Sequence, residues 1–265
     1  MVMHIVGSSG YIATRIKSYI TKDINAKYYS PTPTENEILL ELTDLNSFDF
    51  SYIKEGDYVV FLAAISSPDI CEKQYEYAYS INVTGTKRFI EKCIKNKANV
   101  LFFSSDVVNG ATNGINSEDA IVNPFGKYGE MKYEIEQHFK DSLYFKTFRL
   151  SYVYSRQDKF MSYLDSCVAR GEGAEVFDAL YRNVIYIEDI IEAAFKLKDS
   201  FSQWDNYLFN LSGKELLSRK DMAKMYKDSI NPALKYEVIV PDDSFFKARP
   251  NKIETCSTYL EKLLN

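Results

Sequence analysis

Two residues of complementary chemistry stand one helical turn apart near the middle of the chain. Tyr128 and Lys132 are four positions apart, so on a helix they share one face. An ammonium close to a phenol favours the phenolate and lowers its pKa. Such a tyrosine can exchange a proton with a substrate oxygen near neutral pH. The alternative is an accidental pair, because the chain has 21 tyrosines. The pair follows a predicted strand that ends in Ser104 and Ser105, and this position favours a catalytic role for the pair.

The size and composition fit one large α/β domain, or such a domain with a small appendage. The chain has 265 residues, 46% hydrophobic and 26% charged, with a net charge of −5. It has no basic run, so we expect no nucleic-acid partner. The longest apolar runs have the length of a strand, so we expect no membrane span. The N-terminus enters a strand at once, without a signal peptide, which predicts a cytoplasmic protein.

Potential metal ligands are few and scattered. The four cysteines and two histidines form no Cys-x-x-Cys pair and no cluster. We therefore expect no metal site. The simplest interpretation of the cysteines is that they are reduced thiols, buried or idle, as in a cytoplasmic protein.

A glycine turn lies between the first predicted strand and the first predicted helix. The strand covers residues 2–6, and the turn runs from Gly7 through Gly10 to Ala13 with the spacing Gly-x-x-Gly-x-x-Ala. Backbone N–H groups at a helix N-terminus stabilise a pyrophosphate. The alternative is a plain strand–turn–helix without a ligand. The place of the turn at the start of the chain makes a dinucleotide site an equal alternative.

The remaining periodicities alternate between strands and helices. This order predicts a Rossmann-type, doubly wound parallel sheet over residues 1–155, carrying the serine, tyrosine and lysine. Residues 156–265 are expected to form mainly a small α/β substrate lobe, with some segments returning to the sheet. Strands are expected at 26–30, 38–42, 57–64, 99–105, 145–150, 175–178, 207–211 and 235–240. Helices are expected at 12–20, 70–97, 160–170, 187–199, 218–228, 255–264 and around Tyr128, with a polar loop at 106–116.

The end of the second strand bears on the choice of coenzyme. Enzymes that prefer NAD often carry an acid there for the ribose 2′-hydroxyl. This chain has Ser30 followed by Pro31. The absence of a carboxylate favours NADP(H), with NAD(H) left open. Arg15 could meet a 2′-phosphate or form a helix salt bridge. Asp44 could cap the next helix or reach the adenine.

Several motifs in order carry a family resemblance. Gly-x-x-Gly-x-x-Ala from Gly7, the Ala63–Ala64 pair, the Asn82-Val-Thr-Gly run, Ser104–Ser105 and Tyr128-x-x-x-Lys132 resemble the extended short-chain dehydrogenase/reductase superfamily, the NAD-dependent epimerase/dehydratase family. Segments beginning at Arg182, Tyr207 and Arg249 resemble later motifs of the same family. The chain is most similar to nucleotide-sugar reductases of the dTDP-4-dehydrorhamnose reductase type.

The resemblance implies roles for individual residues. Tyr128 would be the acid/base, Lys132 would lower its pKa and bind the nicotinamide ribose, and Ser105 would hold the substrate carbonyl. Ser104 should point the other way, because side chains alternate along a strand. The implied coenzyme contacts are Gly7, Ser9, Gly10, Tyr11, Ile12, Ser30, Asp44, Leu45, Leu62, Ala63, Ala64, Asn82, Tyr128 and Lys132. The implied substrate contacts are Ser105, Asp106, Val107 and Arg182, where a surface salt bridge is an equal alternative for Arg182.

Departures from the family narrow the expected reaction. The glutamate of the dehydratases' Thr-Asp-Glu run is replaced by Val107, which disfavours dehydration. Gly129 directly after Tyr128 resembles the reductases' Tyr-Gly-x-x-Lys form. The expected activity is NAD(P)H-dependent reduction of a nucleotide-linked ketosugar of the 4-keto-6-deoxy type, with a nucleotide-sugar substrate. An NAD-retaining epimerase and a non-catalytic NAD(P)-binding regulatory protein are the alternatives. The resemblance is compatible with a homodimer.

Overall fold

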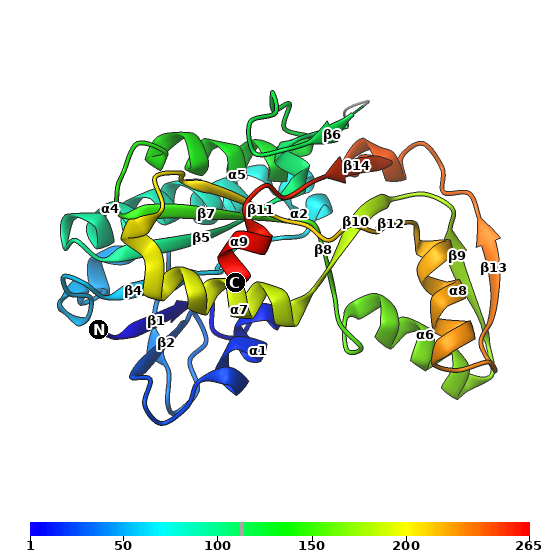
Figure 1. The fold of residues 1–265 in the computed structure, drawn as a ribbon, viewed down its shortest axis with the longest axis horizontal. Coiled ribbons are helices and arrows are strands. Elements are labelled where there is room, and N and C mark those ends of the chain that lie inside the picture. The colour runs from blue at the N-terminus through cyan, green and yellow to red at the C-terminus, as the bar shows by residue number, and fades with distance from the viewer. Residues whose placement is uncertain (112–113) are drawn as a thin grey trace.

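A computed structural model describes residues 1–111 and 114–265. Its centre is a sheet of seven parallel strands in the order β11-β7-β5-β4-β1-β2-β3 (Figure 1). Most of these strands are buried throughout, as a parallel sheet covered on both faces requires. The strands are β1 (Met3–Val6), β2 (Ala26–Ser30), β3 (Ile38–Leu39), β4 (Tyr58–Phe61), β5 (Asn99–Ser105), β7 (Phe145–Leu150) and β11 (Leu208–Leu211). The predicted Rossmann-type sheet is confirmed.

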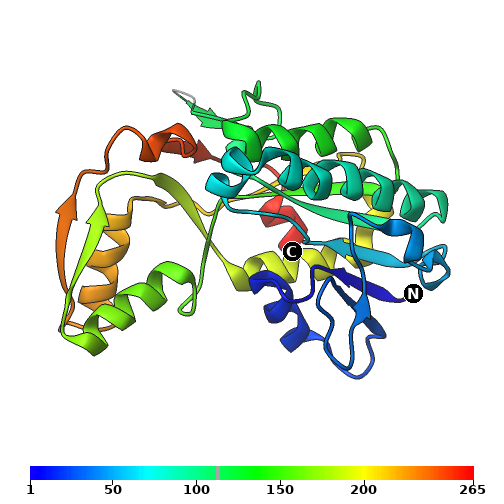
Figure 2. The same cartoon turned by 180° about the vertical axis from the view of Figure 1, so that it is seen from behind.

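Helices cover both faces of this sheet and enclose two apolar cores. One core is closed by α1 (Tyr11–Tyr19), α7 (Ile187–Ser200) and α9 (Leu260–Leu264), on the face seen in Figure 1. The other is closed mainly by α4 (Thr86–Lys95) and α5 (Gly126–Phe139), in front in Figure 2. The sheet is thereby held rigid beneath α5, the helix that carries Tyr128 and Lys132.

The helical stretch expected over 70–97 is found from Pro68 to Lys95, but it is interrupted. The chain forms α2 (Pro68–Lys73), α3 (Tyr75–Tyr79), a π-helix (Ser80–Gly85) and then α4. Gly85 lies so close to Leu42 that an added Cβ would stand 2.2 Å from the Leu42 carbonyl oxygen. The wider π turn brings this backbone against the segment after β3 without such a clash.

Three further expected boundaries also differ. The strands expected at 38–42 and 57–64 end at Leu39 and Phe61, where the sheet pairing stops. The helix expected at 255–264 begins only at Leu260, because Thr255 ends strand β14 (Lys252–Thr255). Of the polar loop at 106–116, residues 112–113 lie outside the described residues. The rest includes a 3₁₀ turn (Asp106–Val108) and β6 (Ile115–Asn116).

A smaller lobe is built from segments after residue 150. Its helices α6 (Lys159–Arg170) and α8 (Arg219–Ser229) pack on the two-stranded sheet of β9 (Gly173–Phe177) and β13 (Lys235–Ile239). A second sheet has the order β12-β10-β14-β6, with β8 paired to β10. It contains β8 (Tyr152–Tyr154), β10 (Tyr181–Tyr186) and β12 (Leu216–Leu217), and in Figure 1 β10 runs from the central sheet towards the lobe.

Segments after residue 155 are shared between the two parts of the molecule. Strand β11 pairs with β7 at the edge of the central sheet, and α7 and α9 pack on its face. The division into two folding units at residue 155 stays a prediction. Within the described ranges, we find no helix long and apolar enough to cross a membrane. Nor does any trio of His, Cys, Asp or Glu within those ranges lie close enough to hold a metal ion.

Candidate active site

A cavity of about 860 Å³ opens at the C-terminal edge of the parallel strands. Ligands of doubly wound sheets bind at this edge. Three parts of the chain meet there: the start of α1, the end of β5 and the first turns of α5. The lining includes Gly10, Tyr11, Ile12, Leu62, Ala64, Ser104, Ser105, Tyr128 and Lys132. The structure therefore brings the proposed catalytic residues together with part of the glycine turn.

A second cavity, of about 290 Å³, continues from the first. Gly10, Leu62 and Ala64 line both, so the two form one track along the sheet edge. Gly7, Ser9 and Ala63 also line the second cavity. Its far end is closed by the segment after β3, where Glu41 lies, and by Tyr77 and Ile81.

Close backbone packing explains the first glycine of the turn. Gly7 has φ +84°, a conformation that favours glycine. A Cβ on Gly7 would stand 2.7 Å from the Ala63 backbone nitrogen. The turn is held from the other side, where Gly7 and Ser8 both donate backbone N–H bonds to the Tyr29 carbonyl at 3.0 Å. Small residues at 7 and 63 therefore let β1 and β4 approach at the edge of the second cavity.

Four residues expected at the coenzyme line neither of these cavities. Ser30 is buried and its hydroxyl accepts from Thr32 N, whereas Leu45 belongs to the apolar core. Asp44 accepts from Asn46 N and caps a short 3₁₀ turn, which was one of its two expected roles. Asn82 bonds both N–H and C=O of Ile65, at 2.8 and 3.0 Å, and so fixes the chain after β4. All four make contacts within the chain, and a coenzyme contact for any of them stays a prediction.

Lys132 is held beside Tyr128 but does not bond it. The Lys132 ammonium donates to the Phe103 carbonyl at 2.8 Å and lies 5.7 Å from the centroid of the Tyr128 ring. Lys132 is only 4% exposed. The lysine is thus anchored to β5, the strand that leads to Ser105.

The expected lowering of the Tyr128 pKa is wrong for this arrangement. Burial raises the pKa of Tyr128 instead, because the charged phenolate is poorly solvated there, and Cys71 and Asp106 add to the effect. Burial also lowers the pKa of Lys132 to about 7, against the opposing effect of Glu136. For both groups, desolvation by burial is the largest cause of the shift. Tyr128 therefore keeps its proton at neutral pH, the form that can donate it.

The paired serines both border the cavity. Ser105 ends β5, and its hydroxyl donates to Asp106 Oδ1 at 3.3 Å. Ser104 was expected to point away, but it also lines the cavity. Strand β5 ends at the cavity, so alternation along the strand does not exclude Ser104 from it. The Ser104 hydroxyl is buried without a hydrogen-bond partner in the described part of the chain, so it is free to meet a ligand.

Asp106 and Arg182 line a smaller cavity of about 210 Å³ beside the main one. Arg182 Nε lies 3.4 Å from Asp106 Oδ2, and Arg182 also donates to the Pro250 carbonyl at 2.8 Å. Arg182 is thus ion-paired, although the pair is largely buried rather than at the surface, and its contact with a substrate stays a prediction. Val107 lines none of these three cavities. Its carbonyl lies under Gly129, where a Cβ would stand 3.1 Å away, which explains the glycine after Tyr128.

Arg219 is a site residue that sequence reasoning misses. It lines both the main and the smaller cavity. Its guanidinium lies 4.0 Å from the Tyr152 ring centroid and 4.9 Å from that of Phe160. Stacking on two rings fixes a planar cation without neutralising it. The only sequence signal is the preceding Ser218, which caps α8 and so places Arg219 at the first helical position.

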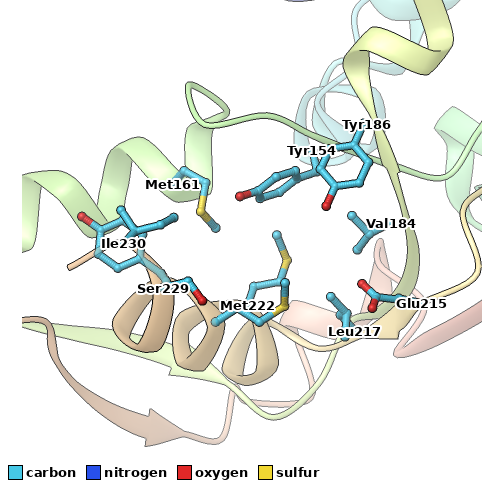
Figure 3. A pocket seen from close by; sticks show the side chains of 11 residues that line it. Tyr154, Met161, Val184, Tyr186, Glu215, Leu217, Met222, Ser229 and Ile230 are labelled. Atoms are coloured by element: carbon cyan, nitrogen blue, oxygen red, sulfur yellow. The ribbon is translucent and has the colours of Figure 1, made fainter. Parts of the chain in front are cut away.

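A separate, mostly apolar cavity of about 140 Å³ lies in the lobe (Figure 3). Met161 and Met222, from α6 and α8, face Tyr154, Val184 and Leu217 across it. It shares no lining residue with the main cavity. Its lining lacks a tyrosine–lysine pair, so we place the candidate chemistry in the main cavity.

The parallel sheet, the glycine turn and the Ser105, Tyr128 and Lys132 set define an extended short-chain dehydrogenase/reductase. Within that superfamily the chain belongs to the RmlD substrate binding domain family, whose model matches residues 1–250. Members of this superfamily are oxidoreductases and epimerases that act on nucleotide sugars. The predicted family membership is therefore confirmed.

Individual similar proteins are distant in sequence. N-acetyl-alpha-D-glucosaminyl-diphospho-ditrans,octacis-undecaprenol 4-epimerase of Escherichia coli O157:H7 is 24% identical over 246 residues, 86% of this chain and 72% of that protein. A hypothetical dTDP-4-dehydrorhamnose reductase from Sulfolobus tokodaii has a TM-score of 0.86 at 21% identity, covering 100% of this chain and 95% of that one. UDP-glucuronic acid 4-epimerase from Bacillus cereus, solved with UDP-glucuronic acid and NAD, has a TM-score of 0.78 at 20% identity, covering 100% and 93%.

Proposed function

We propose that this protein reduces the keto group of a nucleotide-linked 4-keto-6-deoxysugar with NADH or NADPH. The observation that carries the proposal is the main cavity, where Ser105, Tyr128 and Lys132 meet and from which a track leads to the glycine turn. The family and the dTDP-4-dehydrorhamnose reductase-like fold support it. The neutral state of Tyr128 also supports it, because reduction of a ketone needs a proton donor.

The residues present fit a dinucleotide. The glycine turn offers backbone N–H groups at the start of α1 to a pyrophosphate, and a side chain on Gly7 would fill the close approach to Ala63. At the other end of the track, Lys132 and the unpartnered Ser104 hydroxyl can donate to ribose or amide oxygens. When bound, the coenzyme supplies the hydride chemistry.

The side chains supply the acid and the electrostatic part of the reaction. As the keto carbon is reduced, negative charge develops on its oxygen. Ser105 and Tyr128 donate hydrogen bonds to this oxygen, and the Tyr128 proton completes the alcohol. Lys132, anchored on Phe103, places its positive charge near the tyrosinate that remains until solvent restores the proton.

An assay of coenzyme oxidation tests the proposal. The protein is mixed with NADH or NADPH and a panel of nucleotide-linked 4-keto-6-deoxysugars, and absorbance of the reduced nicotinamide is followed. We expect stoichiometric coenzyme consumption with at least one substrate. Interconversion of sugar epimers with tightly bound NAD and no net consumption would instead establish the alternative, an epimerase. The E. coli and B. cereus similarities support that alternative.

Two features favour NADH over NADPH, contrary to the preference inferred from the end of the second strand. Arg15 is paired with Glu188 at 3.0 Å and is not directed to a 2′-phosphate. Glu41 lines the second cavity, and Glu37 bonds the Ser8 hydroxyl of the turn. The pKa of Glu37 is lowered to about 2, chiefly by its bond to Lys17, so this carboxylate is charged. Lys17 pairs with Glu37 at 2.6 Å and offsets its charge, so it is the Glu41 carboxylate at the second cavity that opposes a further phosphate.

Arg219 is expected to bind the charged part of the substrate. Arg219→Ala should raise the KM for the nucleotide sugar by about 10–100-fold, because bonds to charged groups contribute more than neutral ones. The kcat should change little, since the guanidinium acts equally on substrate and transition state. Steady-state kinetics measure both constants. Lys220→Ala is the matched control, since Lys220 is the next residue and pairs with Asp178 at 2.7 Å. An unchanged KM in Arg219→Ala would show that Arg219 does not bind the substrate.

A further inference from the structure

A fully buried ion pair joins the catalytic helix to the neighbouring strand. Arg149, the penultimate residue of β7, is 2% exposed, and Glu136, in α5, is 0% exposed. Arg149 Nε lies 3.0 Å from Glu136 Oε1, and Arg149 Nη2 lies 2.5 Å from Glu136 Oε2. Two parallel bonds of this kind fix the relative orientation of guanidinium and carboxylate as well as their separation.

The same guanidinium also reaches the loop that begins at Ser105. Arg149 Nη1 donates to Asn109 Oδ1 at 3.0 Å, and Asn109 is 0% exposed. Asn109 N bonds the Asp106 carbonyl at 2.9 Å, which closes the turn after the serine. One side chain therefore holds α5 through Glu136 and the serine loop through Asn109.

Glu136 and Arg149 lie next to the proposed catalytic residues along α5 and across the sheet. Glu136 follows Tyr128 and Lys132 at four-residue intervals, so all three share one face of α5. In the pairing of β5 with β7, Ser104 is opposite Arg149 and Ser105 opposite Leu150. Arg149 is thus the strand neighbour of Ser104, and its guanidinium contacts the turn of α5 that follows Lys132.

Stability alone is a weak reason for such an arrangement. Burying a paired carboxylate and guanidinium costs much of what their attraction gains, and apolar replacements of similar size are often no less stable. Directional bonds to two separate elements do fix geometry, and transfer of a proton to a carbonyl oxygen is sensitive to small displacements.

We propose that Arg149, with Glu136 and Asn109, is a positioning device that sets the serine loop against the face of α5 bearing Tyr128 and Lys132. The proposal rests on the proposed function for its kinetic consequences, but its structural consequence does not. Asn109 can be replaced without removing either partner of the Arg149–Glu136 ion pair.

Asn109→Ala tests the proposal by a double-mutant cycle with Ser105→Ala. Alone, Asn109→Ala is expected to lower kcat about 10–100-fold with the coenzyme KM changed less than about threefold. In the Ser105→Ala background the same change should cost less than about threefold, because the hydroxyl that Asn109 positions is already absent. Equal losses in both backgrounds would overturn the proposal.

Two further variants separate positioning from general destabilisation. Asn96→Ala removes an asparagine that bonds Ile53 and Phe50 carbonyls far from the serines, and it should leave kcat unchanged. Asn109→Asp keeps an acceptor oxygen for Arg149 and should restore activity to within about threefold of the native protein. Failure of this rescue, or an equal loss in Asn96→Ala, would also count against the device.

Amide hydrogen exchange gives a readout without turnover. Residues 106–110 should exchange at least about tenfold faster in Asn109→Ala than in the native protein or in Asn96→Ala. If the native protein reduces no ketosugar but the exchange result holds, the proposed function fails and the positioning device stands. Unchanged exchange in residues 106–110 would refute the device whatever the activity.

Discussion

Replacing Tyr128 with phenylalanine is expected to reduce turnover by about 10²–10⁴-fold, the usual effect of removing one acid/base group. Tyr128 borders the main cavity together with Ser105, and its raised pKa keeps the phenol protonated. The phenylalanine ring preserves the packing but offers no proton to the developing alkoxide. The loss should therefore fall on kcat, whereas coenzyme affinity, which we expect to depend on the glycine turn and Lys132, should change less than about threefold.

Steady-state rates and a coenzyme titration of the same preparation measure the two quantities separately. Tyr133→Phe is the matched control, because it removes one phenolic hydroxyl from the same helix at a position that does not line the main cavity. That control should behave as the native protein. Comparable activity of Tyr128→Phe and Tyr133→Phe would mean that another group supplies the proton.

The fold is predictable from sequence because its signals are local. Residues 58–64 and 100–103 are continuous apolar runs, which a strand buried on both faces requires. The turn from Gly7 to Ala13 has a fixed place between strand and helix. The four-residue spacing of Tyr128 and Lys132 needs only a helix to put both on one face, and α5 provides it.

Features set by distant contacts could not be predicted in this way. The helical stretch over 70–97 widens to a π-helix at Ser80–Gly85, where Gly85 lies against Leu42, a contact between segments far apart in sequence. Arg219 joins the site because α8 folds back over β8, where Tyr152 stacks on it. Glu41 reaches the second cavity from the segment after β3. Each depends on packing rather than on any motif.

The ionisation of the Tyr128–Lys132 pair shows the same limit. Proximity of an ammonium to a phenol predicts a lower phenol pKa, but only where water still solvates the charged forms of both groups. Lys132 lies under the ring and against the Phe103 carbonyl, where desolvation is the larger effect. Burial is a property of the assembled core, so the sign of this pKa shift required the structure.

Replacing Lys132 with methionine is expected to stabilise the free protein near pH 6 while abolishing most turnover. The pKa of Lys132 is lowered from 10.5 to about 7 by burial. Below about pH 7 the lysine is charged in the folded and the unfolded chain, so the folded state carries the full cost of burying the charge. By the size of the pKa shift, this cost is on the order of 3–5 kcal/mol.

The advantage of methionine must shrink as the pH rises. Between about pH 7 and pH 10.5 the unfolded chain binds one more proton at residue 132 than the folded chain. The free energy of unfolding of the native protein therefore rises with pH in this window, relative to Lys132→Met, which has no proton there. Urea unfolding of both proteins at about pH 6, 8 and 10 measures the difference, which should be largest at the lowest pH.

Lys127→Met is the control, since Lys127 is on the same helix but exposed and paired with Glu130 at 2.9 Å. Its difference from the native protein should be small and nearly independent of pH. A Lys132→Met protein that is less stable than the native one at pH 6, or equally shifted at every pH, would show that Lys132 is not a buried, destabilising cation. If the trend holds, the free protein tolerates a charge that its fold disfavours, which is expected of a lysine retained for binding or catalysis rather than for packing.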